Sequence, residues 1–197
     1  ARQLHANFST LQSMNSKFFF ALAYTFFLSL FSVMGGELKG RVTTTNGTGL
    51  AGAIVRVVSD VPKTLASSFT NEAKLTVRNG RVNPPVLIVQ TGQPFTVTSE
   101  DASPYNAHIV FRESISRNFG LFKGMTKTIQ AEKPELFARV SEDLGRLQGY
   151  VCVLENAAYA LTAADGSFQL PELPAGTYTV EAAHPRQGRI KQDITVS

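Results

Sequence analysis

Several residue types that carry chemistry are rare or absent in this chain of 197 residues, which has one cysteine, three histidines and no tryptophan. The single cysteine, Cys152, excludes an intramolecular disulfide framework and any zinc or iron–sulfur site made of cysteines alone. Without tryptophan, a platform for stacking sugar rings would have to use Tyr or Phe. Charged residues make up 17% of the chain and hydrophobic residues 43%. This is the composition of a globular chain and excludes a disordered one.

The longest apolar run, residues 18–34, follows a basic residue and ends at two glycines. A basic start, an apolar middle and small residues at the exit are typical of a secretory signal peptide. We therefore predict that residues 1–36 are a leader, that Met14 is the true start, and that the mature protein is secreted or periplasmic. An uncleaved membrane anchor is the alternative, because 17 apolar residues lie near the lower limit for a bilayer span. Only in that case is the membrane a partner.

From residue 37 onward, short runs rich in Val, Ile, Thr and Phe alternate with Gly, Pro, Asn and Asp. This pattern predicts an all-β fold of the sandwich or barrel type. Asn79-Gly80 predicts a tight hairpin turn, and the one helix expected is a short segment over 141–147. The predicted strands are 38–43, 53–58, 75–78, 81–82, 86–90, 95–98, 108–111, 125–130, 137–140, 149–154, 159–162, 168–170, 177–183 and 190–196.

Alternation within the predicted strands indicates which side chains are buried. In segment 177–183, Tyr178, Val180 and Ala182 share one face, while Glu181 lies on the opposite, polar face. Segment 149–154 has no polar face, which favours a central strand covered on both sides. Cys152 within it is therefore expected to be a small buried hydrophobe and not a reactive thiol.

Motifs at the two ends of the chain resemble carboxypeptidase-regulatory-like domains. The motifs are ADGSFQLPELPAGTYTVEAAHP at 164–185 and GELKGRVTTTNGTGLAGAIVRVV at 36–58, which resembles the first hairpin of that domain type. The resemblance implies that residues 37–69 and 158–197 form one β-sandwich. We expect its core to combine Val42, Ile54, Val55 and Val57 with Phe168, Tyr178, Val180 and Ile194.

The middle of the chain is similar to cupredoxin-like domains of the plastocyanin kind. The similarity is carried by RVNPPVLIVQTGQPFTVTSEDASPYNAHIVF at 81–111 and by SEDLGRLQGYVCVLEN at 141–156. It implies that residues 70–157 form a Greek-key sandwich inserted into the carboxypeptidase-regulatory-like one. Two domains in series, with the opening hairpin belonging to the cupredoxin-like part, are the alternative.

Blue copper centres need two imidazoles and a thiolate, usually with a weak thioether. The resemblance places Tyr105, Ser141, Leu144 and Leu147 at those four positions. None of them is a ligand of the family, so the resemblance implies the scaffold without the copper, and no cofactor is expected. Copper would be the cofactor only under the alternative function, periplasmic electron transfer.

One polar cluster is the candidate ligand-binding site. His108 is placed to hydrogen-bond Asp101 or Tyr105 in a loop mouth. A nucleophile elbow, a phosphate-binding glycine loop and zinc-ligand spacing are all missing from the sequence, so no catalytic residue and no metal site is predicted. The acidic residues of the middle segment alternate with basic ones and are expected to form a mixed-charge surface; they are Glu132, Glu135, Glu142 and Asp143.

These patterns favour a non-catalytic binding or structural module of the cell envelope or exterior, and not an enzyme. Carbohydrate is one expected ligand class, because carboxypeptidase-regulatory-like sandwiches resemble starch-binding domains in fold. An envelope protein is the other expected partner. The formal net charge is only +4, and no basic patch is evident, so a nucleic-acid partner is not expected.

Overall fold

The computed structural model describes residues 26–31, 38–59, 61 and 72–196. This part of the chain contains strands and turns and no helix, so the predicted all-β class is confirmed. It also contains no helix that could cross a membrane. The strands are β1 (Phe26–Phe31), β2 (Lys39–Thr44), β3 (Ile54–Val57), β4 (Ala73–Arg78), β5 (Arg81–Asn83), β6 (Val86–Gln90), β7 (Pro94–Ser99), β8 (Tyr105–Val110), β9 (Arg117–Leu121), β10 (Thr126–Gln130), β11 (Glu135–Glu142), β12 (Gly149–Leu154), β13 (Tyr159–Leu161), β14 (Ser167–Gln169), β15 (Gly176–His184) and β16 (Gly188–Val196).

Strands β4 to β12 form what we call the central sandwich. Its two sheets have the strand orders β10-β7-β4-β5 and β6-β12-β11-β8-β9. Inward-facing side chains of both sheets, among them Phe95, Ile109 and Val151, share one apolar core. The period of two along each strand places these side chains inward and leaves the alternate ones on the outer faces.

Strands β1 to β3 and β13 to β16 form what we call the terminal sandwich. Its sheets have the orders β1-β2-β14 and β13-β3-β15-β16. Seven of the eight residues expected in this core lie in it: Val42, Val55, Val57, Phe168, Tyr178, Val180 and Ile194. The eighth, Ile54, faces the other way, because neighbouring residues of a strand point to opposite faces.

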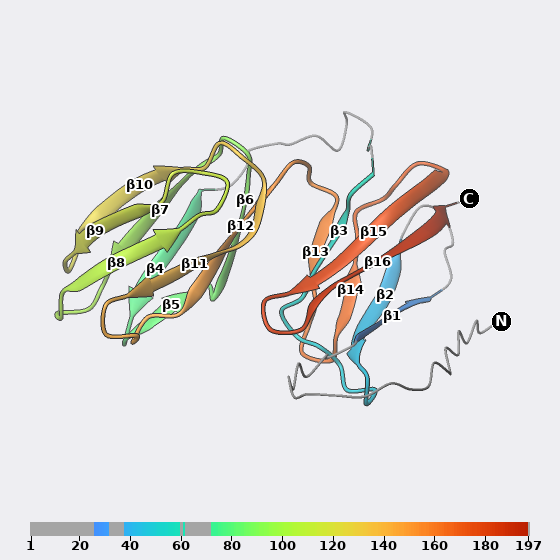
Figure 1. Ribbon diagram of the computed structural model, residues 1–197, viewed down its shortest axis with the longest axis horizontal. Coiled ribbons are helices and arrows are strands. Elements are labelled where there is room, and N and C mark those ends of the chain that lie inside the picture. Colours follow the sequence, from blue (N-terminus) through green and yellow to red (C-terminus); the bar gives the residue numbers. More distant parts are fainter. Residues whose placement is uncertain (1–25, 32–37, 60, 62–71, 197) are drawn as a thin grey trace, which may run out of the picture.

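The two sandwiches lie side by side and contact each other through a third apolar cluster (Figure 1). Ile54 and Ala183 of the terminal sandwich meet Leu136, Cys152 and Leu154 of the central one. This contact covers the outer face of β12, so the predictions that β12 is covered on both sides and that Cys152 is buried are confirmed. Burial also raises the pKa of the Cys152 thiol to about 12.

The central sandwich occupies the place of a hairpin loop in the terminal sandwich. Strands β3 and β13 pair antiparallel, with Arg56 opposite Tyr159, although all of β4 to β12 lies between them in sequence. Glu72, before β4, and Ala157, after β12, line the same cavity, so the two ends of the inserted segment lie near each other. Whether the two parts fold independently stays a prediction.

Three expectations for local structure are wrong. Residues 38–43 and 53–58 do not pair as a hairpin, because β2 and β3 belong to different sheets and face one core from opposite sides. Residues 141–147 form no helix; β11 runs to Glu142 and a turn follows, in which Gly145 has φ +70°. Strand β9 was not expected, since its sequence, RNFGL, has no β-branched residue; it is an edge strand held by β8.

The predicted leader lies outside the described residues except for Phe26–Phe31. These six residues form β1, which pairs antiparallel with β2 from Phe26 opposite Thr44 to Phe31 opposite Lys39. The secretory leader stays a prediction.

Candidate functional site

The sequence-predicted site is at one end of the central sandwich, where Asp101 and Tyr105 meet. The Tyr105 hydroxyl donates to Asp101 Oδ2 at 2.7 Å. The backbone N–H groups of Asn79 and Gly80 donate to the same carboxylate at 2.6 and 2.8 Å. These bonds, that of Gly80 foremost, lower the pKa of Asp101. Asp101 and Tyr105 thus fasten the β4–β5 turn to the start of β8.

A second group of charges packs against Tyr105 from the β11–β12 turn. The Arg146 guanidinium carbon lies 4.9 Å from the centre of the Tyr105 ring, and Arg146 Nη2 lies 3.1 Å from Glu142 Oε2. The backbone N–H of Leu144 donates to the same Glu142 oxygen at 3.0 Å. Glu142 is buried, contrary to the expected mixed-charge surface, because the turn that follows it folds back over its carboxylate.

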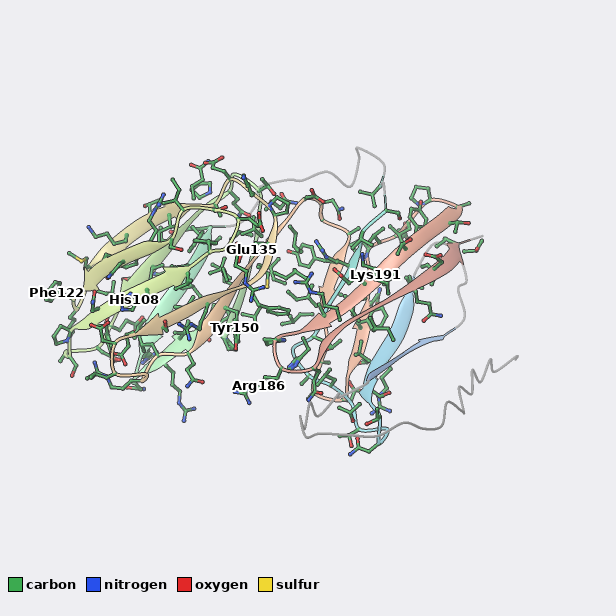
Figure 2. The ribbon with its side chains drawn as sticks, in the orientation of Figure 1. His108, Phe122, Glu135, Tyr150, Arg186 and Lys191 are labelled. Atoms are coloured by element: carbon green, nitrogen blue, oxygen red, sulfur yellow. The ribbon has the colours of Figure 1, made fainter. Side chains whose placement is uncertain are left out.

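His108 does not join Asp101 and Tyr105, so that part of the expectation is wrong. Tyr105 and Ala107 face the core of the central sandwich. The alternate residues of β8, Asn106 and His108, lie on the outer face of the sheet. There His108 Nε2 lies 2.6 Å from Asp143 Oδ1, and Asn106 Nδ2 donates to Asp143 Oδ2 at 2.8 Å. Figure 2 shows His108 on the side of the central sandwich away from the terminal one.

The residues at the four copper positions do not fit a blue copper centre. The Tyr105 hydroxyl is bound to Asp101, and Leu147 is buried while Leu144 is 75% exposed. Neither leucine nor the Ser141 hydroxyl supplies the imidazole or thiolate that copper needs there. The one thiol, Cys152, lies under the terminal sandwich and not at this end. In the part of the chain that the structure describes, no group of three or more His, Cys, Asp or Glu side chains could hold a metal ion.

Acid should weaken this end of the central sandwich through Glu142. The hydrogen bond from Arg146 foremost, aided by the N–H groups of Leu144 and Arg146, lowers the pKa of Glu142 from 4.5 to about 2. A lowered pKa stabilises the fold above the ordinary value, and this contribution is lost as pH falls from 4.5 towards 2. We expect the melting temperature of Glu142→Gln to be lower than wild type at neutral pH and to fall less steeply over that range. Parallel melting curves for the two proteins would contradict this.

A cleft that the sequence did not indicate lies between the two sandwiches. It has a volume of about 400 Å³. Figure 2 shows Glu135, one of its lining residues, where the sandwiches meet. The lining is unusually rich in charge: Arg56, Arg112, Glu113, Lys133, Pro134, Glu135, Leu136, Glu155 and Arg189.

A bulge in β11 shapes the floor of this cleft. The register of β11 against β12 shifts between Glu135 and Ala138, and Phe137 adopts φ +62°. The bulge breaks the alternation of the strand, so the consecutive residues Glu135 and Leu136 are both buried. The Glu135 carboxylate accepts the backbone N–H groups of Arg112 and Glu113 at 2.9 to 3.1 Å. Its negative charge is thus satisfied by the backbone of one wall.

The opposite wall is organised by a buried ion pair. Glu181, 2% exposed, binds Arg56 Nε at 2.8 Å and Nη2 at 2.7 Å through one oxygen. Glu181 was expected on a polar face, but the central sandwich covers that face. Glu181 engages only one side of the guanidinium, and it is the one side-chain partner of Arg56 within the described part of the chain, so the other N–H groups of Arg56 are left for a ligand.

Three further cations of the cleft are uncommitted. Among the described residues, the side chains of Arg112, Lys133 and Arg189 have no ion-pair partner. All three are exposed and come from separate parts of the chain: the β8–β9 connection, the β10–β11 connection and β16. Sequence spacing gives no signal for such a group, because it depends on how the two sandwiches are docked.

Comparison with solved structures finds similarity over about half of the chain. An oxidized mutant of amicyanin is 17% identical, with 50% of this chain and 97% of that chain covered and a TM-score of 0.38. The purple cupredoxin from Nitrosopumilus maritimus is 18% identical, with 42% of this chain and 99% of that chain covered and a TM-score of 0.35. The copper-containing nitrite reductase from Thermus scotoductus is 15% identical, with 51% of this chain and 25% of that chain covered and a TM-score of 0.40. No family model matches the chain, and no curated protein does.

Proposed function

We propose that this protein is a non-catalytic binding module that holds an acidic saccharide, such as a chain of uronic acids, in the cleft between its two sandwiches. The observation that carries this proposal is the set of uncommitted cations, Arg112, Lys133 and Arg189, around a cleft of about 400 Å³. Carboxylates of the ligand would pair with these cations. Its hydroxyls would donate to Glu113 and Glu155, which line the same cleft.

The absence of aromatic side chains from the cleft lining supports an acidic ligand over a neutral one. Neutral sugars are usually held by stacking on aromatic rings, and the described lining has none. Affinity must then come from charge-assisted hydrogen bonds, which are stronger than neutral ones. Arg56 supports the same view, since Glu181 fixes its orientation before any ligand arrives.

A binding role also suits the chemistry of the groups that could otherwise react. Both oxygens of Glu135 are occupied by backbone N–H groups, so it is poorly placed as a general acid or base. Cys152 has a thiol pKa of about 12, so it carries almost no thiolate at neutral pH. In this proposal the protein acts in the periplasm or outside the cell, as the apolar run 18–34 suggests.

The test is calorimetric binding of a galacturonic acid tetramer to the intact protein, with a neutral glucose tetramer of equal length as the control. We expect the acidic oligomer alone to bind, and its affinity to fall roughly tenfold between about 20 mM and 200 mM salt, since salt screens exposed charges. Lys133→Ala and Arg112→Ala should each weaken binding about fivefold or more. Both side chains are exposed, and neither has an ion-pair partner among the described residues, so neither change should alter the melting temperature.

Lys127→Ala is the matched control variant. Lys127 is exposed on β10, in the four-stranded sheet of the central sandwich, and does not line the cleft. The Lys127→Ala substitution removes the same charge as Lys133→Ala, so it reports the effect of net charge alone. Equal loss of binding in Lys127→Ala and Lys133→Ala, or equal binding of the neutral tetramer, would overturn the proposal.

A further inference from the structure

A second cavity, separate from the charged cleft, runs beside β6. Its volume is about 570 Å³, and it is lined by Glu72, Ala73 and Lys74 from the start of β4, by Leu87, Ile88, Val89 and Gln90 of β6, and by Gln93, Ala157 and Tyr159. Three parts of the molecule therefore enclose it: the start of β4, the edge strand β6, and the segment that leads into β13 of the terminal sandwich. We call this cavity the β6 slot.

One wall of the β6 slot is an open sheet edge. β6 is the outermost strand of the five-stranded sheet and pairs only with β12, in parallel. Tyr150 N–H donates to Pro85 O, and Thr91 N–H donates to Leu154 O, both at 2.9 Å. Because pairing alternates along a strand, the residues between, Val86 and Ile88, turn their backbone N–H and C=O groups away from β12 and towards the open edge.

The facing wall offers a second stretch of open backbone. In β4, Val77 O accepts the Glu100 N–H from the β7 side at 2.9 Å, so alternate residues of β4 face the other way. On that side β5 pairs only with Thr76 to Arg78. The backbone of Lys74 thus faces the slot beyond the end of β5.

A buried side chain in the slot has an unmet hydrogen bond. Gln90 is 8% exposed, and among the described residues its Oε1 has no hydrogen-bond partner. A buried acceptor without a donor is unfavourable, and a ligand that supplies the donor relieves this. Gln90 belongs to the slot lining, so the missing donor would come from whatever occupies the slot.

We propose that the β6 slot binds an extended peptide segment of a partner protein, which adds as a strand between β6 and β4. The backbone of the segment would pair with Val86 and Ile88 on one side and with Lys74 on the other, as in strand addition to a sheet edge. A side chain with an amide or hydroxyl would donate to Gln90 Oε1. Alternate side chains would be small and apolar, since they face Leu87 and Val89.

The shape and charges of the slot favour a single peptide strand over a second copy of this chain. Tyr159 and Ala157 of the terminal sandwich stand beside the open edge of β6, so a whole sandwich would meet them before its own edge strand reached β6. Glu72 and Lys74, which are exposed and without an ion-pair partner among the described residues, lie two positions apart at the mouth. A segment with a basic and an acidic residue at the same spacing complements them.

The experiment uses a display library of random octapeptides selected on the full chain. We expect enriched sequences to alternate apolar and polar residues and to lack proline. An enriched peptide, made synthetically, should slow hydrogen exchange at the amides of Lys74, Val86 and Ile88 roughly tenfold or more at saturation. The same peptide with methylated backbone nitrogens should bind at least tenfold more weakly, because it has lost its backbone donors.

Ile88→Pro tests the edge itself. Proline removes only an N–H that faces the open side, so the β6–β12 pairing is kept, and the peptide should bind at least tenfold more weakly. Gln90→Leu, which removes the unmet acceptor, is the second variant and should weaken binding about fivefold. An intact β6 in Ile88→Pro is checked by its circular dichroism and melting temperature. The proposal is overturned if no sequence is enriched, if binding survives both variants, or if the slot instead forms a concentration-dependent dimer that Ile88→Pro abolishes.

Discussion

Gly166→Ala is expected to lower the melting temperature by roughly 10 °C or more, because a methyl group at this position has no room. Gly166 has φ +84°, and a Cβ built on it would lie 2.2 Å from Val42 O and 2.8 Å from Leu50 N. The turn before β14 is pressed against β2 at this point, where Val42 N–H donates to Gly166 O at 2.9 Å. Both the backbone conformation and the close approach require glycine.

Gly47→Ala separates these two causes. Gly47 also has a positive φ, of 81°, but nothing lies within 4 Å of a Cβ placed on it. This variant should be destabilised only by the strain of an alanine at positive φ, which costs about 1 kcal/mol, or a few degrees in melting temperature. Thermal unfolding of the two variants by circular dichroism is the measurement. Equal losses would show that contact with the β2 backbone contributes nothing.

Excision of residues 70–157, with a short Gly-Ser linker in their place, should leave a folded β domain. The two remaining pieces share one apolar core, to which Val42, Val55, Phe168 and Val180 all contribute. Because β3 and β13 pair antiparallel, the linker closes an ordinary hairpin, and loop closure of this kind costs little. Dispersed amide proton shifts in an NMR spectrum are the expected signature.

The excised chain also exposes a face that the central sandwich normally covers, and this provides a control. Ile54 and Ala183 would become solvent-exposed, so Ile54→Thr in the excised chain should improve solubility without loss of the fold. Residues 37–69 alone should be unfolded, since so few strands bury too little apolar surface. An unfolded excised chain, together with a folded fragment of residues 37–157, would instead mean two domains in series.

Sequence periodicity was sufficient for most strands and for the covered position of β12, because alternation and turn residues act locally. It failed for the acidic residues. Glu135, Glu142 and Glu181 are all buried, although charged residues usually lie at the surface. Each is stabilised by partners that no spacing rule identifies: backbone N–H groups of a distant loop, a turn that folds back, or a cation on the neighbouring strand.

The candidate sites were predictable to a smaller extent. Asp101 and Tyr105 were placed in the right neighbourhood because they lie four positions apart in sequence, although the bond between them was not predicted. His108 was assigned the wrong partner, since its actual partner, Asp143, follows directly after β11, and the sequence does not reveal the register of β11 against β8. The charged cleft and the β6 slot both depend on the docking of the two sandwiches, which no local pattern encodes.

The hairpin relation of β3 and β13 also sets the order in which the chain can assemble during synthesis. β2 and β3 leave the ribosome well before β13 to β16, which supply both sheet partners of β3 and the second partner of β2, after β1. The central strands come between them and have all their own partners already present. The central sandwich can therefore fold first. Because its two ends lie near each other at Glu72 and Ala157, its folding places β13 to β16 beside β2 and β3. Until then one edge of β2 and both edges of β3 are unpaired, and these are the places where an incomplete chain can pair with another chain.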